Sequence, residues 1–283
     1  LGFPIEVIAG QEEARLIFSG ITNELPPSPN RRLMIDIGGG STEVIIGKGF
    51  EPIHMSSLYM GCVSYTRQFF PDGHITQARM ERALLAARRE FEGISKQYRK
   101  TGWQEAYGSS GTAKGLIAVL QEGGMSKKGI TLEGLELLKA KLIRDGKVIM
   151  KELPGLKHDR SLVLAGGLAI MLAAFQELKI KVMAPGEGAL RMGVLYDILG
   201  RDSDHDKRDE TVRQFIKRHH IDTRQSERVK RIALQFFSQL DLSDDVEKED
   251  LQRTLGWASD LHEVGISIAH AEYHKHSAYI LHH

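Results

Sequence analysis

Hydrophobic residues in the first part of the chain follow two patterns, short continuous runs and a helical repeat. Apolar runs at 33–37 and 44–46 predict two buried strands on either side of a glycine-rich turn. From 76 to 100, apolar residues recur every three or four positions, which predicts one face of an amphipathic helix. Three prolines between positions 26 and 29 predict a loop ahead of the first of these strands. A further strand-like run covers 3–8.

A strand, a glycine turn and a helix follow one another in three later segments. The predicted strands cover 104–107, 161–164 and 181–183, and the helices that follow them cover 112–121, 168–178 and 188–199. Such alternation favours an α/β layer architecture. Beyond about residue 200 the strand patterns stop, and helices are predicted over 208–219, 225–240 and 248–264. The sequence therefore predicts an α/β region followed by a separate all-α unit.

Composition removes several classes of protein. The 283 residues include 38 Lys and Arg against 37 Asp and Glu, so no global positive field would draw the chain onto nucleic acid or a membrane. No apolar run reaches the roughly 20 residues that a bilayer helix needs, so stable membrane insertion is not expected. The single cysteine, Cys62, excludes an intrachain disulfide framework and favours a reducing, cytoplasmic location.

The two ends of the sequence suggest a piece of a longer protein. Leu1 leads directly into a strand-like run, and His283 ends the chain with no Gly, Pro or polar tail to close a helix. We therefore expect a preceding domain to be missing, and the end of the chain also allows for a missing following one. Clipped termini of an otherwise complete protein are the alternative.

The strongest chemical pattern lies between the two predicted strands at 33–37 and 44–46. Its residues are, in order, Asp36, Gly38, Gly39, Gly40, Ser41, Thr42 and Glu43. Glycines let several backbone N–H groups approach one oxyanion closely, and the two hydroxyls can add further donors. The two carboxylates are hard oxygen ligands that suit Mg²⁺ together with phosphate. The pattern thus predicts a phosphate cradle with a metal beside it. An ordinary tight hairpin turn is the alternative.

Other glycine segments are weaker evidence of a ligand. Gly111 and Thr112 belong to a loop at 108–112 that opens a predicted helix, where free N–H groups can bind an anion. Ser and Thr also cap helices without any ligand, so both interpretations stay open. The glycines at 165–167 could simply permit close packing between a helix and a strand.

Charged clusters elsewhere allow more than one interpretation. On composition alone, Glu12 and Glu13 are acids in a first helical turn that offset the helix dipole. Histidines and a glutamate at 262, 263, 270, 274 and 276 raise the question of a metal, but their spacing matches no zinc pattern, so a polar helix interface is at least as good an explanation. Between 207 and 231 nine basic residues face four acidic ones, which indicates either a solvated helix face or a polyanion-binding surface.

Taken together, these segments resemble the exopolyphosphatase / guanosine pentaphosphate phosphohydrolase family of the actin, Hsp70 and sugar kinase superfamily. The matching segments are 8–18, 35–43, 60–64, 108–112, 188–196, 261–265 and 276–280. They are collinear and cover essentially the whole chain. The glycine-rich core alone would indicate only the superfamily. The double-glutamate helix and the Leu-His-Glu-Val-Gly helix narrow the resemblance to the long form of this family.

The resemblance implies a fold and a domain plan. It implies an α/β fold with a ribonuclease-H-like (actin-like ATPase) domain, followed by a partial all-α domain similar to the HD phosphohydrolase fold. Residues 1–20 would be the end of a first ribonuclease-H-like domain, residues 21–200 the second such domain with the phosphate loop, and residues 201–283 the helical domain. The family also suggests a homodimer of the full-length protein.

The resemblance also assigns roles to residues. Glu13 falls on the family's catalytic glutamate, Asp36 and Glu43 on positions implicated in metal and phosphate binding, and 38–41 on the phosphate loop. The sequence departs from the family at Gln11, where Asn is more usual. It lacks the family's first phosphate loop and its last helices. It also reads His-Glu at 262–263 where metal-dependent HD enzymes have His-Asp, so no metal is assigned there.

The leading hypothesis is therefore an Mg²⁺-dependent hydrolase that removes terminal phosphate from inorganic polyphosphate or from guanosine pentaphosphate. A kinase that holds ATP on the loops at 108 and 166 is a second hypothesis. A third is a polyanion-binding fragment without catalysis of its own, in which Arg213, Lys217 and Arg218 hold the polyphosphate. The sequence does not rank polyphosphate against the pentaphosphate.

Overall fold

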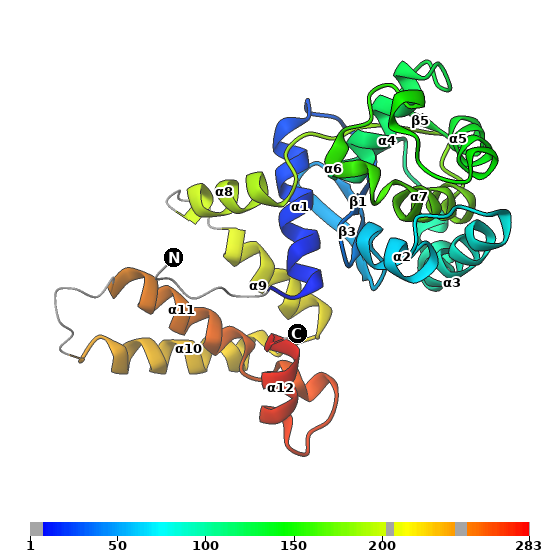
Figure 1. The fold of residues 1–283 in the computed structure, drawn as a ribbon. Helices are drawn as coiled ribbons and strands as arrows, with labels where there is room; N and C mark the ends of the chain where they lie inside the picture. The colour runs from blue at the N-terminus through cyan, green and yellow to red at the C-terminus, as the bar shows by residue number, and fades with distance from the viewer. Residues whose placement is uncertain (1–7, 202–206, 241–247, 283) are drawn as a thin grey trace. The chain divides into compact units, whose positions relative to one another are not determined.

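The computed structural model describes residues 8–201, 207–240 and 248–282 (Figure 1). The predicted strand at 3–8 thus lies almost wholly outside the described residues. The described chain forms two compact units, divided between Tyr196 and Asp197. The first unit contains all strands of the described chain, and the second contains helices. The order of an α/β part followed by a helical part is the one that the expected fold class requires.

The first unit is built on one mixed sheet of six strands in the order β3-β2-β1-β4-β6-β5. Its strands are β1 (Arg31–Ile37), β2 (Thr42–Lys48), β3 (Glu51–Leu58), β4 (Glu105–Gly108), β5 (Ile130–Thr131) and β6 (Val182–Pro185). The first three form an antiparallel meander, whereas β4 runs parallel to β1 and β6 runs parallel to β4. The strands predicted at 33–37, 44–46, 104–107 and 181–183 are thus confirmed.

Helices pack on both faces of this sheet (Figure 1). The helices of the first unit are α1 (Gly10–Glu24), α2 (Cys62–Phe69), α3 (Gln77–Thr101), α4 (Gly111–Glu122), α5 (Leu132–Asp145), α6 (His158–Ser161) and α7 (Leu164–Leu178), with a 3₁₀ turn at Met150–Glu152, and α8 (Leu190–Arg201) begins in this unit and continues past its boundary. In β1, Leu33 and Ile35 pack into the core with α3 and α7, while Met34 packs against α1. Because both faces of these strands are buried, their sequences are continuous runs of apolar residues.

The long amphipathic helix predicted over 76–100 is confirmed as α3. Thr76 caps its start by accepting a hydrogen bond from the backbone N–H of Arg79 at 3.3 Å, and Gly102 ends it with a φ of 66°. Tyr98, on the buried face, donates its hydroxyl to the backbone oxygen of Val44 at 2.7 Å. The side chain therefore ties the end of α3 to β2, the strand next to the β3 edge of the sheet.

One predicted strand is wrong. Residues 161–164 form the end of α6 and the start of α7, and Gly166 and Gly167 lie inside α7 rather than in a loop. A Cβ on Gly166 would lie 2.6 Å from the backbone oxygen of Cys62, and one on Gly167 would lie 2.4 Å from Cγ2 of Thr112. These glycines therefore permit close packing of α7, and they form no phosphate loop.

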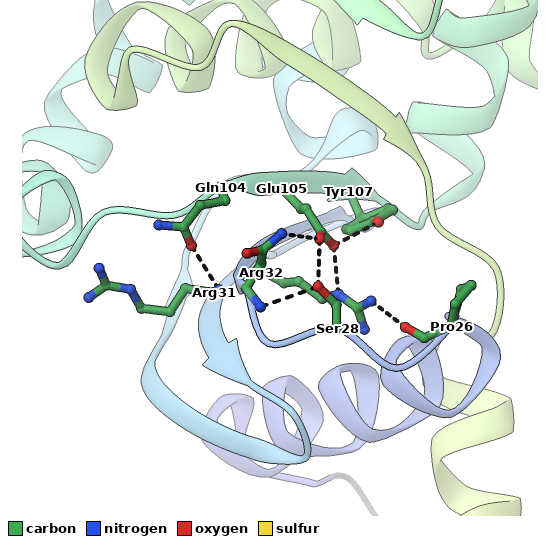
Figure 2. Close-up of polar contacts among 8 residues, drawn as sticks. Pro26, Ser28, Arg31, Arg32, Gln104, Glu105 and Tyr107 are labelled. Carbon is green, nitrogen blue, oxygen red and sulfur yellow. Dashed lines mark hydrogen bonds and ion pairs between the residues drawn. The ribbon is translucent and has the colours of Figure 1, made fainter.

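A buried ion pair holds β1 and β4 in register at the edge of the sheet where both strands begin (Figure 2). Arg32 and Glu105 are directly paired across the two strands, and Nε of Arg32 donates to Glu105 at 2.8 Å. Ser28 and Asn30, from the predicted loop after α1, also donate to Glu105, at 2.7 and 2.8 Å. Burial alone would raise the pKa of Glu105, but these donors and Tyr107 lower it to about 2. The proline loop is thus fastened to the start of the sheet.

The second unit consists of helices in its described part. They are α9 (Lys207–Arg218), α10 (Thr223–Phe237), α11 (Lys248–Leu261) and α12 (Tyr273–His282), with a 3₁₀ turn at Val264–Ser267. The three helices predicted here are confirmed as α9 to α11, although α10 and α11 each end three residues early. Arg208 lies 4.4 Å from the centre of the Trp257 ring, and the indole donates to Asp209 at 2.6 Å, which joins α9 to α11.

Candidate functional site

The glycine turn at 38–41 connects β1 to β2, with Ile37 paired to Thr42 at its base. The hairpin interpretation is therefore correct as geometry. The same register pairs Asp36 directly with Glu43, so the two acids stand side by side on one face of the sheet. The question that remains is which groups in the turn are left for a ligand.

The turn uses its carbonyl groups for the fold and leaves two of its amides available. The backbone N–H of Gly38 donates to Ser41 at 2.9 Å, which closes the turn. The carbonyl oxygens of Gly38 and Gly39 accept from the first residues of α2, with Cys62 at 2.9 Å and Val63 at 3.0 Å. Within the described residues, the backbone N–H groups of Gly39 and Gly40 have no partner, and both glycines are exposed. Two neighbouring free amides are a fitting anion site.

Gly61 lets α2 approach the turn this closely. A Cβ at position 61 would lie 2.3 Å from the carbonyl carbon and oxygen of Gly39 and 2.4 Å from the nitrogen of Gly40. These are backbone atoms, so they could make room only by a change in the turn itself. The Gly61 position thus preserves the conformation in which the carbonyls point into α2 and the amides do not.

The two acids beside the turn are buried. Asp36 is 7% exposed and accepts a hydrogen bond from the Ser109 hydroxyl at 2.5 Å. Glu43 is 1% exposed; its Oε1 accepts from the Ser57 hydroxyl at 2.8 Å, while its Oε2 is buried and has no hydrogen-bond partner. An unpartnered carboxylate oxygen in the interior is costly unless a proton or a cation neutralises it.

Burial and neighbouring charge make both acids weaker than usual. Burial is the main cause of the raised pKa of Asp36, opposed by the Ser109 hydrogen bond and increased by the charge of Glu13. Burial likewise raises the pKa of Glu43 to about 7, and Glu13 and Asp36 add to that rise. The charge of Glu13 thus acts on both buried acids, as expected for a site built to receive a cation or a proton.

Glu13 reaches this site because α1 begins beside β3. A Cβ on Gly10 would lie 2.5 Å from the Ser57 hydroxyl, so the first turn of α1 lies against the strand that supports Glu43. Glu13 is partly exposed, whereas Glu12 forms an ion pair with Arg15 at 2.6 Å. The structure thus brings the predicted catalytic residue to the two predicted metal ligands. Within the described residues, however, no three His, Cys, Asp or Glu side chains are placed to share a metal ion.

The second glycine loop is tied into the fold. The Ser110 hydroxyl accepts from the N–H of Ala113 and from that of Ile37, both at 3.2 Å, so it caps α4 and joins it to β1. The Thr112 hydroxyl donates to the carbonyl of Ile37 at 3.0 Å. Gly111 accommodates a neighbouring cation, since a Cβ there would lie 2.5 Å from Cζ of Arg160. The capping interpretation is confirmed here, and a phosphate contact of Gly111 or Thr112 stays a prediction.

Several predicted residues use their side chains inside the protein. The Thr42 hydroxyl donates to Met60 at 2.6 Å and is fully buried, so only its main chain faces the turn. His262 donates from Nδ1 to the backbone oxygen of Ser259 at 2.7 Å and belongs to no metal cluster of the described chain. Ser57 was not foreseen, because an isolated serine carries no signal until the register places it beside Glu43. Ser109 belongs to the predicted loop at 108–112, but its contact with Asp36 was not foreseen.

The model of the Ppx/GppA phosphatase family matches residues 1–202, and the model of domain III of the Ppx/GppA phosphatases matches residues 207–283. This chain belongs to the Ppx/GppA phosphatase family. Its two family segments adjoin close to the division between the compact units after Tyr196. The further division of 1–20 from 21–200 stays a prediction.

Solved structures of this family share the fold. An exopolyphosphatase-like protein is 23% identical over 71% of this chain and 70% of its own, with a TM-score of 0.61. The Aquifex aeolicus Ppx/GppA family member is 22% identical over 72% and 67%, with a TM-score of 0.58. An exopolyphosphatase from Cytophaga hutchinsonii is 21% identical over 70% and 66%, with a TM-score of 0.60. At these identities the likeness establishes the fold alone.

The expected fold class is thereby confirmed. The strand order and the flanking helices are those of the ribonuclease-H-like, actin-like ATPase domain, and a helical domain follows in this Ppx/GppA phosphatase. As a member of this family, the chain is a phosphatase-type hydrolase. Within the described residues, no helix combines the length and the apolar character required to span a membrane.

Proposed function

We propose that this Ppx/GppA protein hydrolyses the terminal phosphoanhydride bond of inorganic polyphosphate, or of guanosine pentaphosphate, and releases orthophosphate. The observation that carries the proposal is the pair of exposed, unpartnered amides of Gly39 and Gly40 next to three interacting carboxylates. Amides of this kind bind a phosphoryl oxygen, and a carboxylate at the edge of the site can take a proton from water.

A divalent cation, Mg²⁺, fits the acids that flank the turn. Asp36 and Glu43 are hard oxygen ligands, and the buried Oε2 of Glu43 lacks any donor within the described protein. Because no third side chain of the described chain completes a metal site, the other ligands would be water and phosphate oxygens, as is usual for Mg²⁺. When bound, the ion would neutralise phosphate charge and the charge of the two buried acids.

The protein's own groups would act by position. The amides of Gly39 and Gly40 would hold the terminal phosphoryl group, and Gly61 would keep them aimed at it. Glu13, the least buried of the three acids, would orient the attacking water and accept its proton. Positioning and charge stabilisation are what phosphoryl transfer chiefly requires of a protein. General base catalysis adds roughly 10²–10⁴-fold to the rate.

Orthophosphate release by this chain from polyphosphate and from the pentaphosphate, with Mg²⁺, tests the assignment. We expect Glu13→Gln to lower kcat by about 10²–10⁴-fold with little change in binding, because the amides remain intact. Glu12→Gln is the matched control, since Glu12 is occupied by Arg15, and it should keep nearly full activity. Weakened binding with unchanged turnover of the bound complex would contradict the role of Glu13. The ratio of kcat/KM for the two substrates decides between them.

The structure offers less support for the kinase alternative. One of its two glycine loops, at Gly166, is a packed segment of α7 that lies against Cys62.

The polyanion surface keeps a structural basis, because Arg213, Lys217 and Arg218 are exposed on α9. We propose that it contributes to retention of long polyphosphate. Reversing these three charges should then weaken binding of long chains more than that of short ones. Equal affinity of the variant for both would exclude this role.

A further inference from the structure

A second concave site lies at the end of the sheet where β4 and β6 begin, opposite to the end that carries the glycine turn. A cavity of about 470 Å³ opens between the end of α3, the end of α7 and the residues that lead into β4 and β6. Its volume is within the usual range for a small-molecule site, roughly 300–1,000 Å³. Gln104 lines it, and the side-chain oxygen of Gln104 accepts from the N–H of Arg31 at 2.9 Å (Figure 2).

Every ionisable side chain that lines this cavity is a cation. They are Arg99, Lys179 and Lys181. All three are exposed, and none of them forms an ion pair or hydrogen bond within the described residues. Two acids of neighbouring elements are engaged elsewhere, with Glu177 bound to Arg88 and Glu105 bound to Arg32. The cavity therefore has a local positive charge that the protein does not neutralise.

The ordinary explanation for such cations is the helix dipole, and it accounts for only part of the charge. The C-termini of α3 and α7 both end at the cavity, and each carries an effective charge of about −0.5. Two such termini offset about one of the three positive charges. About two positive charges therefore remain without compensation, which suits a ligand with several negative charges.

The cavity also has an aromatic wall. Trp103 is half-buried and lines it together with Gly102 and the buried Ala106. An indole face next to cationic side chains stacks well on a nucleobase, a contact worth about 1–3 kcal/mol in other proteins. Inorganic phosphate chains have no group that could use this wall. The uncompensated positive charge and the aromatic wall together favour a ligand that has both phosphates and a base.

We infer that this cavity binds a nucleoside polyphosphate, with its phosphates on Arg99, Lys179 and Lys181 and its base on Trp103. The site is separate from the proposed active site. Gln104 precedes β4 and Ser109 follows it, and the four residues of β4 span about 13 Å at 3.3 Å per residue. A nucleotide held here would not occupy the glycine turn.

Tryptophan fluorescence tests this site directly, because the chain has only two tryptophans. The variant Trp257→Phe leaves Trp103 as the only indole, and ATP should then quench its emission in a saturable way. Adding Arg99→Gln and Lys181→Gln should weaken ATP binding at least tenfold. Lys100→Gln, which alters an exposed lysine that does not line the cavity, is the matched control and should change affinity by less than twofold.

Tripolyphosphate and adenosine, compared with ATP, show which parts of the nucleotide the cavity recognises. ATP should bind more tightly than tripolyphosphate, and adenosine should bind weakly. Tripolyphosphate that binds as tightly as ATP would overturn the role of Trp103 and the assignment of a nucleotide. Unchanged affinity in the Arg99 and Lys181 variant, or no saturable quenching at millimolar ATP, would overturn the site. Should the Trp257 variant fold poorly, calorimetry compares ATP binding by the otherwise unsubstituted chain with that by its Arg99→Gln, Lys181→Gln form, and the heat that is lost in this form belongs to the cavity. These binding assays are independent of hydrolysis, so they can fail or succeed whatever the activity of the glycine turn.

Discussion

Glu105→Gln is the substitution whose effect on stability follows most directly from the structure. Glu105 holds Arg32, which is 4% exposed, while its own side chain is 24% exposed (Figure 2). The variant leaves the guanidinium buried without its counter-ion. Breaking a buried ion pair from one side costs about 3–5 kcal/mol.

The pKa of Glu105 gives a second way to obtain the loss of unfolding free energy in this variant. It is lowered from 4.5 to about 2, and each pKa unit corresponds to about 1.4 kcal/mol, so the ionised carboxylate contributes about 3 kcal/mol to folding. A lowered pKa stabilises the fold above pH 4.5, and this contribution is lost as the pH falls through 2. The difference in unfolding free energy between the parent and Glu105→Gln should therefore be about 3 kcal/mol at pH 7, and it should shrink by about 2 kcal/mol between pH 5 and pH 3.

Urea titration followed by Trp103 fluorescence in the Trp257→Phe background measures the first unit specifically. Glu177→Gln is the matched control, because its partner Arg88 is 49% exposed and such pairs contribute at most about 1 kcal/mol. A loss below about 1 kcal/mol for Glu105→Gln, or a difference that stays constant from pH 7 to pH 3, would refute this reasoning.

Two further substitutions, each with a matched control, test the packing of the first unit. Gly61→Ala should lower the unfolding free energy by about 1–3 kcal/mol and slow phosphate release at least tenfold, because its Cβ would collide with backbone atoms of the glycine turn. Gly93→Ala, in an open position on α3, should instead stabilise the protein by about 0.5–1 kcal/mol. Tyr98→Phe should cost about 1 kcal/mol through the lost hydrogen bond to β2, whereas Tyr59→Phe, 97% exposed, should change stability by less than about 0.5 kcal/mol. Urea unfolding and phosphate release measure these effects; an active Gly61→Ala enzyme of normal stability would contradict the packing argument.

The pattern of apolar residues predicted the elements that are buried on both faces or along one regular helical face. The strands around the glycine turn are buried on both faces, so their apolar runs were visible in the sequence. The apolar face of α3 repeats at helical spacing over 25 residues. The segment at 161–164 misled because a short apolar run ahead of two glycines is typical of a strand, whereas here the glycines lie inside the fully buried helix α7.

The candidate site was predictable in part. The acids and glycines between the first two strands belong to one short segment, so their proximity follows from the hairpin. The approach of Glu13 depends on how α1 packs beside β3, and that contact joins positions more than 40 residues apart. The cation cavity was not foreseen, because Arg99, Lys179 and Lys181 meet only when the ends of α3 and α7 come together.

The proposed function requires that the free amides of the glycine turn bind phosphate. Selective ¹⁵N-glycine labelling of the chain, followed by titration with orthophosphate and Mg²⁺, observes those amides directly. The signals of Gly39 and Gly40 should shift together and saturate, while that of Gly93 on the exposed side of α3 stays in place. Unmoved signals of Gly39 and Gly40 under conditions in which the protein releases phosphate would contradict it.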